Sequence, residues 1–253
     1  MDSKIYVSAI KITEPIPKDN YLSGLPVVDN LIKMKELTFS KPITFFVGEN
    51  GIGKSTLIEA IAVKFGFNPE GGTRNYNFRT KNTHSKLHEY IGLVKTCNFA
   101  KSGYFLRAES FYNAISYVEY LDREFATDTG YLEHLQQKGE GTSCLHQMSH
   151  GESFLRTIND FRANGLYILD EPEAALSPNG IMKIMCRINA LVEKGCQFII
   201  STHSPILTTL PNADIYQLSN DAIERVEYTQ TEHFLITKKF LNAPEQMVKY
   251  LLD

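Results

Sequence analysis

The feature that most constrains the fold is a glycine-rich run, Val47-Gly48-Glu49-Asn50-Gly51-Ile52-Gly53-Lys54-Ser55-Thr56. Its glycines and its Lys-Ser pair follow the spacing G-x-x-x-x-G-K-[ST]. An apolar, β-rich stretch at 43–47 precedes the run, and a helical pattern of apolar residues at 57–62 follows it. Because a strand–loop–helix unit with this spacing wraps a polyphosphate, the sequence predicts an α/β protein that binds a nucleoside triphosphate.

Two side chains of this run have expected chemical roles. The ammonium group of Lys54 can reach the β- and γ-phosphates and is a candidate catalytic group. The hydroxyl of Ser55 is placed to ligate Mg²⁺. A plain glycine turn before a helix would not explain why Lys and Ser follow the last glycine.

Two acidic residues follow another apolar run. Residues 166–169 read Leu-Tyr-Ile-Leu, which is typical of a strand buried on both faces of a parallel sheet. Asp170 and Glu171 follow it. We expect Asp170 to hold Mg²⁺ through a water molecule and Glu171 to act as general base on the attacking water. The alternative is a solvated turn that happens to carry two carboxylates.

A histidine follows a third buried strand. The strand is predicted at 198–202, and His203 comes directly after it. A neutral imidazole at this point could sense the γ-phosphate and orient the attacking water with Glu171. Taken alone, His203 could equally be a loop residue with a structural hydrogen bond.

A second candidate anion site is Ser149-His150-Gly151-Glu152-Ser153, which precedes a helix with an apolar face. Ser149 and Gly151 at a helix start offer backbone N–H groups to an anion, and Glu152 lies in the same turn. One phosphate chain does not need two such sites within one chain. We therefore expect this site to serve the nucleotide of a partner subunit.

Together these elements resemble the ABC-type ATPase superfamily, and the resemblance covers about residues 35–210. The motifs occur in the family's order: phosphate loop (48–56), signature (149–153), Walker B (166–171), D-loop (174–178) and switch histidine (His203). The residues of these motifs look most like those of the stand-alone bacterial ATPases of the RecF/SMC-related (AAA family ATPase) branch, and less like those of transporter motors. His150 departs from the glycine that many signatures carry at this position.

The resemblance implies an Mg²⁺-dependent ATPase that works as an ATP-sandwiched homodimer. It also implies a glutamine-loop residue that touches the metal and the attacking water. Glu109 is the first candidate for that place and Arg107 the second, while a simple surface turn is the alternative. ATP rather than GTP is expected from the resemblance alone.

We expect a single domain, 1–253, of the P-loop NTPase fold with ABC-type architecture. A mixed sheet would form the core, and strands at 4–12 and 37–39 an antiparallel β subdomain beside the nucleotide, where Tyr21 could stack on adenine. A mainly helical lobe is predicted at about 81–148. No sustained heptad pattern occurs between the phosphate loop and the signature, which excludes a long coiled-coil arm.

Composition limits the partners. The net charge of −3 gives no general attraction to nucleic acid, so a DNA contact would need a local patch such as Arg74 to Lys86 or Lys238-Lys239. The four cysteines lack metal-type spacing, and no apolar run approaches the length of a membrane span. A cytoplasmic protein is expected.

Three function classes remain open. The first is a soluble mechanochemical switch in DNA maintenance or anti-phage defence, with DNA or a separately encoded effector as partner. The second is the ATPase subunit of an ABC transporter. The third is a nucleotide-sensing regulatory module whose slow hydrolysis times a protein–protein interaction.

Overall fold

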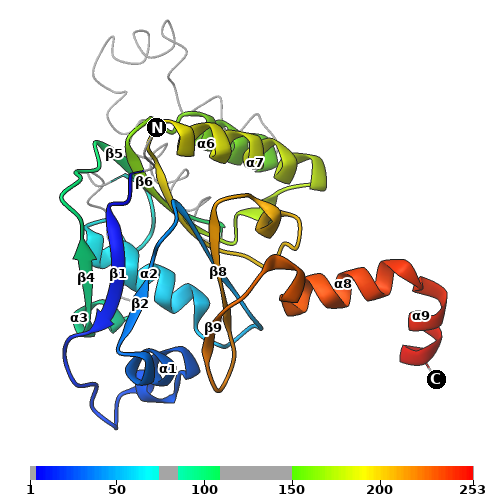
Figure 1. Ribbon diagram of the computed structural model, residues 1–253, viewed down its shortest axis with the longest axis horizontal. Coiled ribbons are helices and arrows are strands. Elements are labelled where there is room, and N and C mark those ends of the chain that lie inside the picture. The colour runs from blue at the N-terminus through cyan, green and yellow to red at the C-terminus, as the bar shows by residue number, and fades with distance from the viewer. Residues whose placement is uncertain (1–3, 74–84, 109–149, 253) are drawn as a thin grey trace, which may run out of the picture.

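The computed structural model describes residues 4–73, 85–108 and 150–252 (Figure 1). Its elements are, in chain order, β1 (Val7–Ile12), η1 (Tyr21–Gly24), α1 (Pro26–Met34), β2 (Glu36–Thr38), β3 (Ile43–Val47), α2 (Lys54–Phe65), α3 (Leu87–Tyr90), β4 (Ile91–Lys95), β5 (Ser102–Arg107), α6 (His150–Asn159), β6 (Gly165–Asp170), η3 (Pro172–Ala175), α7 (Pro178–Glu193), β7 (Gln197–Ser201), η4 (Leu207–Thr209), β8 (Ala213–Leu218), β9 (Ile223–Arg225), η5 (Tyr228–Gln230), α8 (Glu232–Asn242) and α9 (Pro244–Leu252).

The central layer is a sheet with the strand order β5-β6-β7-β3-β8-β9. Its first five strands run parallel, and β9 pairs antiparallel with β8 at the edge. The strand β3, which leads into the phosphate loop, lies between β7 and β8. Since neighbouring parallel strands end at the same edge, the residues that follow β3, β6 and β7 lie along the edge where Arg107, the last residue of β5, also lies.

Successive side chains of each central strand point to opposite faces of the sheet, and each face packs into its own hydrophobic core. In β6, Leu166 and Ile168 face one core while Tyr167 and Leu169 face the other. The first core contains α1, α2 and the antiparallel strands, and the second contains α6 and α7. This two-sided burial explains why the parallel strands read as continuous apolar runs.

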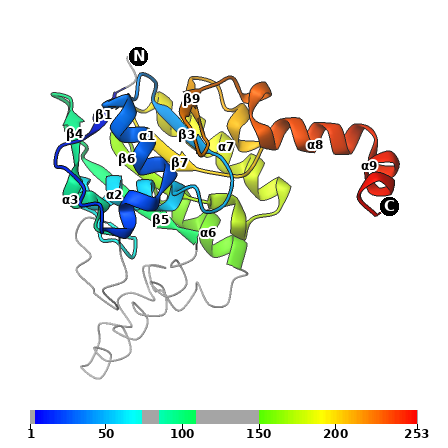
Figure 2. The same cartoon turned by 90° about the horizontal axis from the view of Figure 1, so that it is seen from below.

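A second sheet has the order β2-β1-β4, and both of its pairings are antiparallel. The helix α2 packs between this sheet and the central one, as the two views together show (Figure 2). The expected antiparallel β subdomain is therefore confirmed. Its third strand, however, comes from the segment expected to begin the helical lobe.

That segment differs from the expectation of a helical lobe starting near residue 81. Residues 91–95 form β4, and residues 102–107 form the edge strand β5, so the short α3 is the only helix between 85 and 107. Long-range pairing with β1 decides the state of β4, because Ile10 pairs with Leu93 and Ile12 with Ile91. The rest of the predicted lobe, 109–149, lies outside the described residues and stays a prediction.

A helix, α1, lies between β1 and β2. Pro26 occupies the first turn of α1, where a missing N–H costs nothing. Val27, Val28 and Leu31 are buried on one face of the helix. Pro26 thus marks the start of this helix.

The two C-terminal helices are α8 and α9. They extend away from the body of the domain (Figures 1 and 2), and neither contains a buried residue. Among the described residues, no helix has the length and apolar character that crossing a membrane requires. Cys97, Cys186 and Cys196 are free thiols.

Candidate nucleotide-binding and catalytic site

The phosphate loop connects the end of β3 to the first residue of α2. Gly48, Gly51 and Gly53 have φ angles of +146°, +83° and +102°, which L side chains rarely adopt. A Cβ on Gly48 would lie 2.4 Å from the carbonyl oxygen of Leu218, and one on Gly53 would lie 2.4 Å from Cγ1 of Val27. The loop therefore packs tightly against β8 and α1, and its shape needs glycine.

Lys54 is the first residue of α2, and only 4% of its surface is exposed. Its Nζ donates hydrogen bonds to the carbonyl oxygens of Gly48 and Glu49, both at 2.8 Å. Burial lowers the pKa of Lys54, while the carboxylates of Glu171, Asp170 and Glu173 act in the opposite direction. A buried ammonium group held by neutral carbonyls at a helix N-terminus suits an anionic ligand.

Asp170 ends β6 beside the first turn of α2. Its Oδ1 accepts hydrogen bonds from Ser55 Oγ at 3.2 Å and from Ser201 Oγ. Burial raises the pKa of Asp170, and the bond from Ser201 and the charge of Arg107 work against that rise. Within the described residues, no group of three or more His, Cys, Asp or Glu side chains could hold a metal ion.

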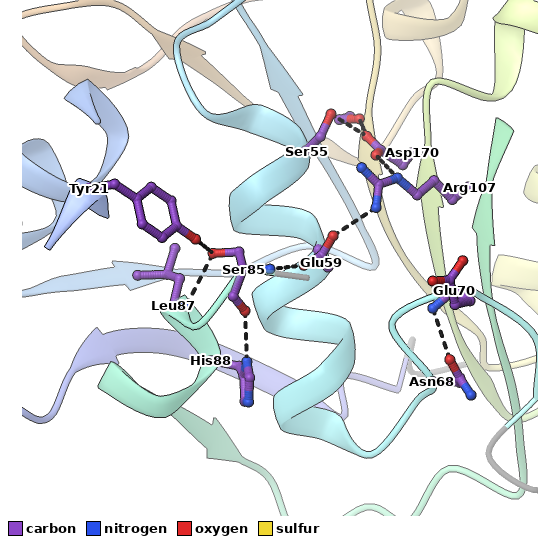
Figure 3. Close-up of polar contacts among 11 residues, drawn as sticks. Tyr21, Ser55, Glu59, Asn68, Glu70, Ser85, Leu87, His88, Arg107 and Asp170 are labelled. Carbon is purple, nitrogen blue, oxygen red and sulfur yellow. Dashed lines mark hydrogen bonds and ion pairs between the residues drawn. The ribbon is translucent and has the colours of Figure 1, made fainter. Parts of the chain in front are cut away.

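Arg107 ends β5 and joins Asp170 to α2 (Figure 3). Its Nη1 lies 2.7 Å from Oε2 of the buried Glu59, and its Nε lies 3.6 Å from Oδ2 of Asp170. Since β5 and β6 are paired in register at Arg107 and Asp170, the two side chains leave the sheet at the same level. The guanidinium group therefore bridges a helix carboxylate and the Walker B aspartate.

The same network continues away from the site (Figure 3). The other oxygen of Glu59, Oε1, accepts a hydrogen bond from the backbone N–H of Ser85 at 2.7 Å. The hydroxyl of Tyr21, a mostly exposed side chain, donates to Ser85 Oγ at 3.0 Å. A polar chain thus runs from Asp170 to η1. Stacking of Tyr21 on adenine stays a prediction.

Glu171 has a left-handed backbone conformation, with φ 51° and ψ 54°. A non-glycine residue in this region carries strain of about 1 kcal/mol or more, and such strain gathers at functional sites. The N–H of Glu171 is held by the carbonyl oxygen of Ser201 at 3.1 Å. The turn brings Oε1 of Glu171 to 3.3 Å from Nε2 of His203, which follows β7.

His203 is fixed by two further residues. Its backbone N–H donates to Oε1 of Glu173, and its Nδ1 lies 3.1 Å from Nε2 of His233 on α8. Burial lowers the pKa of His203 to about 4, and Lys54 and His233 contribute in the same direction. The imidazole is therefore neutral at physiological pH.

Two family profiles match the chain. One, described as "AAA domain", matches residues 31–140, and the other, described as "AAA domain, putative AbiEii toxin, Type IV TA system", matches residues 98–209. Together they include the phosphate loop, Asp170, Glu171 and His203. Over residues 31–209 the chain is similar to AAA-domain proteins. It is an enzyme that binds and hydrolyses ATP.

Solved structures similar to this ATPase include ATP-binding cassettes. One is an ATP-binding cassette of an ABC transporter, with 20% identity, a TM-score of 0.47, and coverage of 94% of this chain and 98% of that one. A nucleotide-free cassette from an ABC transporter has 18% identity, a TM-score of 0.44, and coverage of 95% and 97%. CbiO1 from Clostridium perfringens, part of the ABC transporter complex CbiONQ, has 15% identity, a TM-score of 0.43, and coverage of 98% and 99%. No curated protein matches the chain.

The residues expected to form the site of the ATPase lie in three different situations. Lys54, Ser55, Asp170, Glu171 and His203 come together at the carboxyl edge of the central sheet. Gly151 and Glu152 lie in the first turn of α6. Ser149 and Glu109 lie outside the described residues, and of the two glutamine-loop candidates only Arg107 is described.

Four residues of the site were missed: Glu59, Glu173, Ser201 and His233. Glu59 had a local signal, because a carboxylate in the apolar stretch between Ile58 and Ile61 needs a buried partner. Ser201 and Glu173 adjoin predicted strand ends but carry no motif. His233 had no signal, since only tertiary packing brings α8 to His203.

Proposed function

We propose that the chain is a Mg²⁺-dependent ATPase that closes as an ATP-sandwiched homodimer and acts as a mechanochemical switch in DNA maintenance or anti-phage defence. The observation that supports this proposal best is the meeting of Lys54, Asp170, Glu171 and His203 at one sheet edge. A buried cation, a buried carboxylate, a strained carboxylate and a neutral imidazole are the groups that phosphoryl transfer to water requires.

The side chains present suit Mg²⁺. Ser55 Oγ and Asp170 Oδ1 are hard oxygen ligands 3.2 Å apart, and nucleotide-bound Mg²⁺ needs only one or two protein oxygens besides phosphate and water. We assign Ser55 and Asp170 to hold the ion. When bound, Mg²⁺ would neutralise charge on the β- and γ-phosphates.

The hydrolytic step follows from the remaining groups. Water attacks the γ-phosphorus, its proton passes to the carboxylate of Glu171, and the bond to the β-phosphate oxygen breaks to release ADP. Lys54 neutralises charge on the β- and γ-phosphates. His203 can donate from Nε2 toward the γ-phosphate and keep Glu171 in place.

The test of this assignment is the Glu171→Gln variant. Glutamine keeps the shape of the side chain but cannot take the proton from water. Turnover should therefore fall by about two orders of magnitude or more, while ATP affinity stays the same. Steady-state hydrolysis and binding of a fluorescent ATP analogue measure the two quantities.

A matched control is Glu193→Gln, at the exposed end of α7, which should hydrolyse ATP like the wild type. If Glu171→Gln also turned over ATP at the wild-type rate, Glu171 would not be the base.

The homodimer follows from the second anion site. Gly151 and Glu152 lie in the first turn of α6, and Ser149, which precedes this helix in the sequence, lies outside the described residues. The nucleotide of one subunit would lie between its own phosphate loop and this turn of the partner. The Glu171→Gln variant with ATP should sediment as a dimer, and adding Ser149→Arg should return it to a monomer. A monomer at high ATP and micromolar protein would exclude the homodimer.

The proposed biological role draws on the family description that names a putative AbiEii toxin of a Type IV TA system. A switch acting on DNA should show DNA-stimulated turnover that weakens steeply with salt. The basic residues Arg74, Arg79 and Lys81 lie outside the described residues, and reversing them to Glu should abolish the stimulation. Co-purification with a membrane protein would instead support a transporter role. If neither DNA stimulation nor such co-purification were observed, the nucleotide-sensing module would be the remaining function class.

A further inference from the structure

The start of α8 reaches the catalytic groups of the ATPase. Nε2 of His233 lies 3.1 Å from Nδ1 of His203, and the two rings meet edge to face with their centroids 4.9 Å apart. His203 in turn places its Nε2 3.3 Å from Oε1 of Glu171. The order His233–His203–Glu171 links a C-terminal helix to the proposed base.

The chemistry of the contacts decides where the protons lie. Between two neutral imidazoles one nitrogen must donate and the other must accept. If Nδ1 of His203 carried the proton, its bare Nε2 would point a lone pair at the carboxylate of Glu171. If His233 donates from Nε2 to Nδ1 of His203, then Nε2 of His203 carries the proton and faces that carboxylate favourably. The second arrangement is the one that the distances favour.

The surroundings of His203 and His233 favour the neutral form of both rings. Burial lowers the pKa of His233, and Lys54 adds to this effect, while Glu232 and Glu49 act against it. Burial and Lys54 also lower the pKa of His203. Among the described residues, Nε2 of His203 has no aligned hydrogen-bond acceptor, because its 3.3 Å contact with Glu171 is an electrostatic contact and not a hydrogen bond. A proton on Nε2 is therefore available to a γ-phosphate oxygen placed in the plane of the ring.

The body of the domain holds His233 in place although most of α8 is exposed. Thr231, just before the helix, is buried, and its Oγ1 donates to the carbonyl oxygen of Tyr228 at 2.8 Å. The N–H of Glu232 points to Oε1 of Gln217 on β8 at 3.4 Å, and the ring of Phe234 packs edge to face on Tyr228. Leu235 and Ile236, one step further, are 52% and 56% exposed. The first turn is therefore anchored, and it is the turn that carries His233.

We propose that His233 is a positioning residue for ATP hydrolysis: by donating a hydrogen bond to His203, it holds His203 in the tautomer that carries its proton on Nε2. This inference rests on the proposed roles of Glu171 and His203. It makes the anchored first turn of α8 part of the catalytic machinery, so a displacement of this turn would slow hydrolysis.

The kinetic test compares His233→Phe with His233→Gln. Phenylalanine keeps a flat ring but has no donor, and kcat should fall about tenfold, which is the effect of losing one net hydrogen bond, while KM for ATP stays the same. Glutamine places an amide N–H near the position of Nε2, and kcat should recover to within about threefold of the wild type. Leu241→Phe, which adds a phenyl ring at a 70% exposed position near the other end of the same helix, should leave kcat unchanged.

A spectroscopic test separates this inference from the proposed function. ¹⁵N chemical shifts of the imidazole nitrogens distinguish the two tautomers of His203 whether or not Glu171 is the base. The wild type and His233→Gln should show a protonated Nε2, and His233→Phe should show a mixture or a protonated Nδ1.

Loss of kcat in His233→Phe, with rescue by glutamine and a change of tautomer, supports the positioning role. Unchanged kcat in His233→Phe, equal loss in both variants, or an unchanged tautomer would overturn it. Glu171→Gln serves as the independent measure of the proposed base.

Discussion

Ser201 donates a hydrogen bond to Oδ1 of Asp170 from the neighbouring strand, and the two residues are register partners in β7 and β6. Both side chains are almost fully buried. The sheet itself thus delivers a hydroxyl donor to the carboxylate that we assign to Mg²⁺. This donor would support the proposed metal site from behind the residues that hold the ion.

Replacing Ser201 by Ala should weaken the metal site. The carboxylate of Asp170 loses a donor that lowers its pKa, so more Mg²⁺ should be required for half-maximal hydrolysis, by about tenfold. Unfolding experiments should also show a loss of about 1–2 kcal/mol. Ser204→Ala is the matched control, because Ser204 is buried nearby and its Oγ accepts from the N–H of Leu207. An unchanged Mg²⁺ requirement in Ser201→Ala would contradict the assignment of Asp170.

Arg107 and Glu59 should behave as one unit in a double-mutant cycle. Arg107→Met leaves the carboxylate of Glu59, whose side chain is 6% exposed, without its cation. Because Arg107 is partly solvent-exposed, we expect a loss of about 2 kcal/mol, below the range for fully buried pairs. Adding Glu59→Met should return part of that stability. Urea unfolding gives the free energy of unfolding of the wild type, the two single variants and the double variant. Strictly additive losses would mean that Arg107 and Glu59 are not coupled.

The glycines of the phosphate loop should differ in their tolerance of alanine. Gly51→Ala meets no atom within 4 Å and should cost about 1 kcal/mol, the strain of its positive φ. Gly48→Ala adds a contact of 2.4 Å with the backbone of Leu218, so its cost should exceed about 2 kcal/mol, with loss of ATP binding. Gly24→Ala, which has open space and no positive φ, is the control. Equal thermal stability of the Gly48 and Gly51 variants would show that the loop can relax away from β8.

The sequence predicted the parts of this ATPase whose signals are local. The phosphate loop, Asp170 and Glu171 each sit at the end of an apolar run, and a buried strand with a polar terminus can be recognised without knowledge of its neighbours. By contrast, β4 was not recognised, because Ile91–Lys95 becomes a strand through pairing with β1. His233 was missed for the same reason, since nothing within α8 indicates that its first turn meets His203.

The low pKa of His203 predicts how acid affects folding. In the unfolded chain a histidine takes up a proton near its ordinary pKa of 6.5, whereas His203 in the folded protein does so only near pH 4. Between these values the unfolded state binds more protons, so the contribution of His203 to stability is constant above pH 7 and falls as the pH drops from 6.5 toward 4. The raised pKa values of Asp170 and Glu173 act in the opposite direction, so the wild type must be compared with His203→Gln rather than read alone. The stability of the wild type relative to this variant should fall by about 2 kcal/mol over that interval, since the partial exposure of the ring reduces the effect of the full shift. Urea unfolding at pH 7.5, 6.0 and 5.0 measures the difference, and a difference that did not change with pH would mean that His203 titrates normally in the folded protein.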